Sequence, residues 1–389
     1  MALRSLTIAF YTDSYTPAID GVVTSIINFS SELKKRGHKV YIFTSGTNST
    51  KCNHKNKNII VSKSIAFKNY PQYNIALFPF LSSIKLRKIK PDIIHLQTPF
   101  GMGLSGLLSS KFSRIPSVST FHTMFNDKTI INEYVSKNKY IKTLLLKSSW
   151  QYIKFFYNNT NSIIVPSIAI KQILEKHGIK NNINIIPNGL NTQYFNPRIN
   201  GSKTRKALGG SKNDKLVIYV GRLSREKKLE TLIKASRLLS KNIKFIIIGD
   251  GPAFGYYKNL ALKSNVQDRF KFLGFIDHKD LGKYYSASDL FCIPSTFETQ
   301  GLVALEAMAC NKPVVAANYL ALKEIIKPGQ NGEIFKPLDS ASCAAKIKKV
   351  LNNIDSYKYN SSTAQNYSIQ KMTDKLLDVY KNVIDSNKY

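Results

Sequence analysis

The sequence is poor in cysteine and in long apolar runs, and each shortage excludes a class of protein. Its four cysteines, Cys52, Cys292, Cys310 and Cys343, share no C-x-x-C spacing, which argues against a disulfide framework or a zinc cage and indicates a reducing compartment. No apolar run reaches the roughly 18 residues that a membrane-spanning helix needs. The N-terminal residues enter a strand-like stretch directly and lack a cleavage signature, so a mature cytosolic protein is predicted.

Acidic residues are scarce: 24 Asp and Glu stand against 57 Lys and Arg, a net charge of +33. This excess favours an anionic partner, such as nucleic acid, anionic lipid or a phosphorylated small molecule. The alternative is that abundant Lys, Asn and Ile reflect only an AT-rich genome. Hydrophobic residues make up 43% and charged residues 21% of the 389, which excludes intrinsic disorder and predicts two or three globular domains.

Predicted strands and helices alternate along almost the whole chain. In the first half, apolar strands are expected at 5–12, 38–44, 93–96, 117–120 and 162–165. After about residue 200 the pattern restarts, with short β-branched strands at 216–220, 243–248, 270–273, 290–293 and 314–316. Such alternation predicts parallel sheets covered by helices on both faces. The polar stretch 196–214 separates two similar α/β domains with a cleft between them.

Ligands bind beyond the carboxyl ends of parallel strands, so residues that follow strands are the candidates for a site. Glu298 and Glu306 follow one such strand. If both lay on one helix, they would face the same side roughly 10 Å apart. Gly301, at the expected helix start, would let backbone N–H groups point at an anion. Two carboxylates beside such a helix end suit a nucleotide sugar. Glu306 could instead be a surface charge, but its apolar neighbours predict that it is buried.

Cations and a histidine follow other strands. Gly221 and Arg222 end the first strand of the second half, and Lys227 comes five residues after Arg222, so the two cations could meet a diphosphate. In a chain this basic, such a pair also arises by chance. In the first half, Gly21 ends a loop before a helix, where the backbone could reach a phosphate or an acceptor; a plain loop is the alternative. His122 ends a strand that faces the cleft, which favours a functional over a structural role.

Together these residues resemble a retaining glycosyltransferase of family GT4, and the similarity covers nearly the whole chain. Its most specific signature is the E-x7-E element of Glu298 and Glu306, joined to Gly221, Arg222 and Lys227. The resemblance implies a GT-B fold, with two Rossmann-like parallel-sheet domains facing across a cleft. The domains expected are an acceptor-binding domain at 1–196, a donor-binding domain at 197–365, and a helix at 366–389 that returns toward the first.

The resemblance also implies roles on the donor side. Glu298 would hydrogen-bond the hydroxyls of the donor sugar, and Glu306 the ribose of the nucleotide. Arg222 and Lys227 would neutralise the diphosphate. No Asp-x-Asp motif stands in the expected places, so no metal and no cofactor are implied; UDP-glucose or GDP-mannose would be a substrate.

Backbone amides around Gly301 and Leu302 would hold phosphate oxygens, and Gly221 belongs to the same donor site. His122 would lie near the transferred sugar, so it is expected to be catalytic together with Glu298, Arg222 and Lys227. Asp13 and Gly21 match the acceptor-side loop of the family, although an Asp-Gly pair replaces the common Gly-Gly form.

Short stretches including T-D-S-Y-T-P, H-L-Q-T-P-F-G and E-T-Q-G-L are similar to the diacylglycerol glucosyltransferase subgroup. This likeness implies transfer of a hexose, expected to be glucose, with α configuration retained, to a membrane lipid such as diacylglycerol. The alternatives are a phosphoinositide, polysaccharide or soluble sugar acceptor. In another class, a non-catalytic basic protein that binds nucleic acid or membrane would explain the charge, but not the two glutamates of the E-x7-E element.

Two basic segments suit an anionic membrane surface. Residues 129–157 carry five lysines against one glutamate, with aromatic and aliphatic residues between them, and residues 84–90 form a second patch. The alternative is a core helix with a solvated lysine face. We therefore expect a cytoplasmic, peripheral protein at the inner face of the cell membrane, without a specific nucleic-acid partner.

Overall fold

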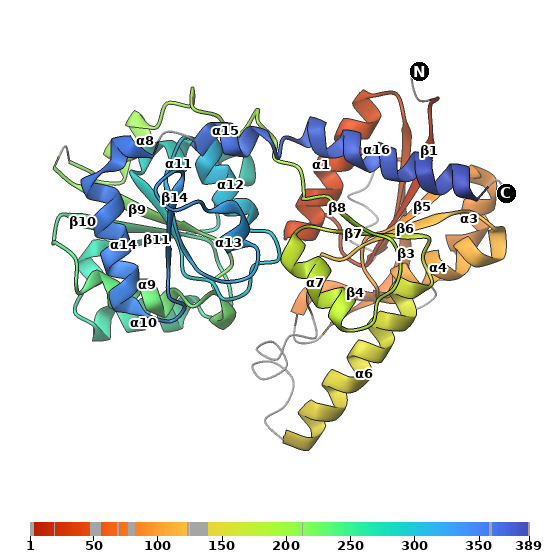
Figure 1. The fold of residues 1–389 in the computed structure, drawn as a ribbon, viewed down its shortest axis with the longest axis horizontal. Helices are drawn as coiled ribbons and strands as arrows, with labels where there is room; N and C mark the ends of the chain where they lie inside the picture. The colour runs from red at the N-terminus through yellow and green to blue at the C-terminus, as the bar shows by residue number, and fades with distance from the viewer. Residues whose placement is uncertain are drawn as a thin grey trace. The chain divides into compact units, whose positions relative to one another are not determined.

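The computed structural model of the chain describes residues 4–18, 20–46, 56–67, 70–76, 82–122, 124, 139–211, 213–357 and 360–387. The chain folds into two compact units (Figure 1). The first consists of Met1–Gly189 together with Ile369–Tyr389, and the second of Leu190–Ser368.

The first unit is built on an eight-stranded sheet with the order β4-β3-β2-β1-β5-β6-β7-β8. Strand β4 is antiparallel to β3, and every other neighbouring pair is parallel. The strands are β1 (Thr7–Thr12), β2 (Lys39–Gly46), β3 (Ile59–Phe67), β4 (Tyr70–Ala76), β5 (Ile93–Leu96), β6 (Ser117–Thr120), β7 (Ser162–Val165) and β8 (Ile183–Ile185). The helices are α1 (Gly21–Lys35), α3 (Ser82–Ile89), α4 (Gly101–Ser113), α6 (Lys139–Asn158), α7 (Ile168–Lys176) and α16 (Ile369–Ser386).

The last helix of the chain, α16, belongs to the core of the first unit. Leu376 and Tyr380 of α16 are buried in one apolar cluster with Ile8 and Phe10 of β1. Arg36, at the end of α1, donates to the Asp374 carboxylate at 2.5 Å and so joins α1 to α16. The core of this unit is therefore assembled from both ends of the sequence.

The second unit has a six-stranded sheet with the order β11-β10-β9-β12-β13-β14 and parallel pairing throughout. The strands are β9 (Lys215–Val220), β10 (Ile243–Ile248), β11 (Phe270–Gly274), β12 (Leu290–Ile293), β13 (Val314–Ala317) and β14 (Gly332–Phe335). The helices are α8 (Ser202–Ala207), α9 (Leu229–Ser236), α10 (Phe254–Lys263), α11 (Leu281–Ala287), α12 (Leu302–Ala309), α13 (Leu322–Ile325), α14 (Ser340–Asn352) and α15 (Asn360–Gln365).

Apolar clusters cover both faces of this second sheet. Leu232 of α9 and Ile347 of α14 pack on one face, and Leu305 and Met308 of α12 pack on the other. Strands buried on both sides read as continuous apolar runs in the sequence, which is why the short β-branched stretches predicted them. The predicted class, two α/β units with parallel sheets, is confirmed.

The structure divides the chain between Gly189 and Leu190, whereas the composition break suggested a boundary between Asn196 and Pro197. Leu190 donates its N–H to the carbonyl of Tyr367 at 2.8 Å. Leu190 and Phe195 are both buried in the core of the second unit. The segment before the polar stretch therefore packs with the residues that follow it.

Candidate active site

Gly221 and Gly249 directly follow β9 and β10 in the second unit. Gly221 follows β9 with φ +154° and donates its N–H to the Ile248 carbonyl at 3.0 Å. A Cβ atom at Gly249, after β10, would stand 2.0 Å from the Gly221 oxygen, so a side chain there has no room. Arg222 follows at the carboxyl edge of the sheet, and its carbonyl accepts a hydrogen bond from the Tyr219 hydroxyl at 3.2 Å.

A half-buried ion pair joins the loops after β9 and β12. The Lys227 ammonium, in the 3-10 turn Arg225–Lys227, donates to Glu298 Oε1 at 2.7 Å and to the Phe297 carbonyl at 3.3 Å. The Lys227 and Glu298 side chains are only 20% and 14% exposed. Since β9 and β12 are neighbours in the sheet, the fold brings together one cation and one carboxylate that the sequence analysis had singled out separately.

Helix α12 begins at Leu302, so the expected helical offset between the two glutamates is wrong. Gly301 precedes the helix in the left-handed conformation, with φ +81° and ψ +43°, and Glu298 lies in the loop before it. A Cβ atom at Gly301 would approach Leu322 Cδ2 to 2.8 Å. Because Gly301 is left-handed, no continuous helix joins Glu298 to Glu306. The two carboxylates therefore have different neighbours.

Glu306 is buried in the second unit, as its apolar neighbours predicted, and both of its oxygens have partners. Its side chain is 2% exposed. Oε1 lies 2.7 Å from His278 Nε2, and Oε2 accepts from the Tyr285 hydroxyl at 2.9 Å. Burial alone would lower the pKa of His278, but the charge and hydrogen bond of Glu306 outweigh it, and the pKa is raised. An edge-to-face contact with Phe195 helps to fix the orientation of the His278 ring.

In the first unit, Asp13 directly follows β1, and its carboxylate is hydrogen-bonded to α4. Oδ1 accepts from the Met102 N–H at 2.7 Å and Oδ2 from the Thr98 hydroxyl at 2.5 Å. Burial raises the pKa of Asp13, and these hydrogen bonds oppose the rise. Gly21 is the first residue of α1, and a Cβ atom there would meet nothing within 4 Å.

His122 follows β6, and its Nε2 lies 2.8 Å from Oε1 of Gln97, which follows β5. Burial lowers the pKa of His122 to about 3, so its ring is neutral at physiological pH. A second histidine, His95, is hydrogen-bonded through Nδ1 to the Tyr380 hydroxyl at 2.5 Å and through Nε2 to Thr120 Oγ1 at 2.6 Å. Gln97 and His95 were not predicted from the sequence, although each is a polar residue in or beside an apolar strand.

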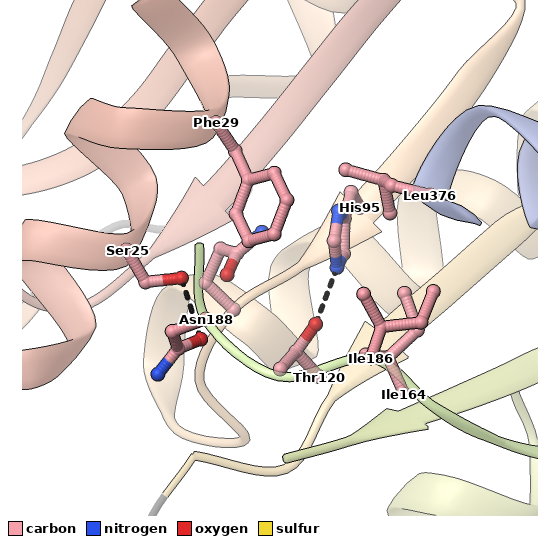
Figure 2. A pocket seen from close by; sticks show the side chains of 9 residues that line it. Ser25, Phe29, His95, Thr120, Ile164, Ile186, Asn188 and Leu376 are labelled. Carbon is pink, nitrogen blue, oxygen red and sulfur yellow. Dashed lines mark hydrogen bonds between the residues drawn. The ribbon is translucent and has the colours of Figure 1, made fainter. Parts of the chain in front are cut away.

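Gln97, His95 and Thr120 line a cavity of about 10 Å³, close to the space that one water molecule needs. Figure 2 shows Ser25 of α1 bonded to Asn188 on one side of this cavity and Thr120 bonded to His95 on the other. Polar side chains thus converge on this cavity inside the first unit, and one of them, Gln97, bonds to the candidate residue His122.

The part of the first predicted membrane segment that lies in α6 has residues on two faces, one exposed and one buried. Its exposed face carries two apolar residues, Leu144 and Phe155, and two lysines, Lys147 and Lys154. Ile153, Phe156 and Tyr157 are buried, so these residues belong to the core. The buried face and the exposed lysines agree with the alternative of a core helix with a solvated lysine face, and membrane binding by the exposed face stays a prediction. Residues 129–138 lie outside the described part of the chain.

The second predicted patch forms most of α3, where Ile84 and Lys85 are exposed and Leu86 is buried. Within the described ranges, no helix is long and apolar enough to cross a membrane. The same ranges contain no cluster of three or more histidine, cysteine or acidic side chains that could hold a metal ion.

Two units built on mainly parallel sheets, with charged residues beyond the carboxyl ends of the second sheet, match the GT-B glycosyltransferases, enzymes that use a nucleotide sugar. Residues 19–194 match the family described as Glycosyltransferase Family 4, and residues 201–367 match that described as Glycosyl transferases group 1. The chain belongs to glycosyltransferase family 4.

Similar proteins cover most of the chain. The alpha-monoglucosyldiacylglycerol synthase of Acholeplasma laidlawii is 34% identical over 340 residues, which cover 84% of each chain. The synthase of the same name from Streptococcus pneumoniae is 31% identical over 336 residues, covering 84% of this chain and 75% of that one. Among solved structures, a sucrose-phosphate synthase from Thermosynechococcus elongatus has a TM-score of 0.81 at 21% identity, covering 98% of this chain and 100% of the other.

Proposed function

We propose that this enzyme transfers glucose, with retention of the α configuration, from a nucleotide diphosphate glucose to the hydroxyl of diacylglycerol. The names of the two synthases support the sugar and the acceptor. The observation that carries the donor site is the contact between Lys227 and Glu298. In this proposal Lys227 would meet the diphosphate, and the neighbouring Glu298 would accept hydrogen bonds from the sugar hydroxyls.

The cations would stabilise the leaving diphosphate. An ammonium group has three N–H donors. In Lys227 two of them meet Glu298 and the Phe297 carbonyl, and the third would meet a phosphate oxygen. Arg222 would add a forked guanidinium, and amides at the start of α12 would bind further oxygens. Fixed charges aimed at a developing negative charge are usually the largest catalytic contribution.

Glu306 would bind the ribose while remaining bonded to His278 and Tyr285. Each carboxylate oxygen has two acceptor sites. One on each oxygen is used by these neighbours, and the other would accept from a ribose hydroxyl. His278 and Tyr285 would thereby hold a buried carboxylate in the orientation that the nucleotide needs.

On the acceptor side we assign Asp13 and Gly21 different roles. Asp13 would support the acceptor loop, because its carboxylate is engaged with α4. Gly21 lies in open space at the start of α1, where the backbone could be approached by an acceptor. His122 would lie near the transferred sugar.

We also propose that the exposed face of α6 binds anionic lipid at the cytoplasmic side of the membrane. Lys147 and Lys154 lie on the same face as exposed Leu144 and Phe155. In Figure 1 the first half of α6 extends away from the sheet of its own unit. A lysine close to an anionic surface contributes about 1 kcal/mol. The exposed apolar side chains beside the lysines would enter the headgroup region.

The function is tested by transfer from radiolabelled UDP-glucose to diacylglycerol in anionic and in neutral vesicles. Labelled glucosyl lipid from the wild type, lost in Glu298→Gln and Lys227→Met but kept in Lys234→Ala, is the expected result. Lys234 is an exposed lysine of the same unit. Product from GDP-mannose alone, or from a soluble acceptor alone, would replace the proposed donor or acceptor. Full activity in Glu298→Gln would contradict the site.

Membrane binding is tested separately by flotation with vesicles. Replacing both Lys147 and Lys154 by glutamine should weaken binding to anionic vesicles by about 2 kcal/mol, roughly 30-fold. The control replaces Lys241 and Lys263, two exposed lysines of the second unit, and should bind like the wild type. Equal loss in both double variants would mean that net charge, and not this face, governs binding.

A further inference from the structure

The loop after β9, residues 221–227, is held by the hydroxyls of two buried tyrosines of the second unit. Tyr219, in β9 itself, donates to the Arg222 carbonyl at 3.2 Å. Tyr257, in α10, donates to the Ser224 carbonyl at 2.9 Å. The two tyrosines are 1% and 0% exposed, so each can act on a ligand only through the loop that it contacts.

The two hydroxyls complete the hydrogen bonding of the carbonyls that they reach. A carbonyl oxygen has two lone pairs. The Arg222 oxygen accepts from the Ser224 N–H at 3.2 Å in addition to the Tyr219 hydroxyl. The Ser224 oxygen accepts from the Lys227 N–H at 3.1 Å in addition to the Tyr257 hydroxyl. Because Ser224 caps the 3-10 turn that carries Lys227, Tyr257 fixes the point at which this turn begins.

Both hydroxyls keep the proton that they donate. Burial raises the pKa of Tyr219, and the charge of Glu298 raises it further. Burial likewise raises the pKa of Tyr257, with a further contribution from Glu230. Gly221 leaves room for the first hydroxyl, since a Cβ atom at this glycine would stand 3.1 Å from it. The loop is therefore supported by two permanent donors.

We propose that Tyr219 and Tyr257 are positioning residues that hold this loop so that the Lys227 ammonium meets the second phosphate of a nucleotide diphosphate. The inference rests on the proposed function, in which Lys227 meets the diphosphate. Lys227 lies 2.7 Å from Glu298, the carboxylate assigned there to the sugar, and the second phosphate is the one that carries the sugar. Since the loop is already ordered, little ordering is left for the binding step, which favours affinity.

Hydrogen exchange of the full chain tests, without any ligand, whether the hydroxyls hold the loop. Tyr219→Phe and Tyr257→Phe keep the rings, and each should speed exchange in peptides that cover residues 221–228. Unchanged exchange in β13 would show that the variants are folded. Tyr357→Phe is the matched control, because it removes a buried hydroxyl of the same unit that bonds to Glu333 at 3.2 Å. Equal loop exchange in all four proteins overturns the positioning role.

Calorimetry with UDP and UMP tests what the positioning serves. Loss of either hydroxyl should raise the Kd for UDP about 3- to 10-fold, the factor that corresponds to one hydrogen bond, and should leave the Kd for UMP, which lacks the second phosphate, nearly unchanged. In a Lys227→Met background, Tyr257→Phe should have no further effect on the Kd for UDP. An equal loss for UMP, or a full effect in that background, overturns the proposal. Tyr357→Phe should bind both nucleotides like the wild type.

These measurements separate the two ideas. If the wild type binds GDP in place of UDP, the same comparison is made with GDP and GMP. A wild type that binds neither diphosphate would refute the proposed function, while hydrogen exchange would still decide whether the hydroxyls hold the loop. Faster loop exchange with an unchanged Kd for the diphosphate would overturn the role of the tyrosines in binding, whatever the enzyme transfers.

Discussion

Replacing His278 by alanine should destabilise the second unit, and more strongly at acidic than at alkaline pH. The variant removes the partner of Glu306 Oε1, at 2.7 Å, and leaves a carboxylate that is 2% exposed with one hydrogen bond fewer. A hydrogen bond to a charged group contributes about 1.5–3 kcal/mol. The His278 side chain is 31% exposed, so solvent screening places the expected loss at the lower end, about 1.5–2 kcal/mol.

The pH dependence has a definite sign because the pKa of His278 is raised above its ordinary 6.5. A raised pKa means that the folded state binds the proton more tightly than the unfolded state. The stabilisation is then fully present below about pH 6.5 and is lost as the pH rises through the raised value of the folded protein. The difference in unfolding free energy between wild type and His278→Ala should therefore shrink as the pH rises above about 6.5 and through the raised pKa of the folded protein.

Urea unfolding followed by circular dichroism at several pH values measures this difference. Tyr285→Phe is the matched control: it removes the other hydrogen bond of Glu306, at 2.9 Å, without removing a group that titrates in this range. Its effect should be the same at each pH. The reasoning is refuted if the loss in His278→Ala does not change with pH, or if Tyr285→Phe shows the same pH dependence.

Three further substitutions test separate parts of the structure. Gly301→Ala should lower the free energy of unfolding by about 1–2 kcal/mol, because alanine is strained in the left-handed conformation of this residue, and the contact with Leu322 should add to the loss. The variant should also raise the Kd for the nucleotide in calorimetry, and an unchanged Kd would argue against an amide site at α12. Tyr380→Phe removes the hydroxyl on His95 Nδ1 and should lower the unfolding free energy by about 1–3 kcal/mol, a loss that urea titration would detect or exclude. Arg36→Ala should increase hydrogen exchange in α16, and equal protection in both proteins would show that the ion pair does not hold that helix.

The sequence predicted the parts of the fold that depend on local pattern. Strands buried on both faces are continuous apolar runs, and Gly221 and His122 follow them where expected. The burial of Glu306 was also predictable, because every neighbouring position in its helix is apolar. These inferences needed only periodicity and the chemistry of burial.

Partners distant in the sequence could not be predicted. Lys227 and Glu298 are 71 positions apart, and their contact depends on β9 and β12 being neighbours in the sheet. The partnership of His278 with Glu306 likewise depends on tertiary packing. The helix that would have aligned the glutamates is interrupted because Gly301 is left-handed, a choice that glycine permits but does not require. In α6, an amphipathic pattern alone does not say which aromatic side chains meet the core.

The placement of α16 has a consequence for how the protein is made. Its residues leave the ribosome only after Leu190–Ser368 has been synthesised, so the first unit waits for the last segment of its core. At about 5–20 residues per second, the roughly 180 residues of the second unit impose a delay of about 10–35 s. The second unit, which is continuous in sequence, can fold during that time. We therefore expect the second unit to fold before the first, and a nascent chain that stops before α16 to lack part of the core of the first unit.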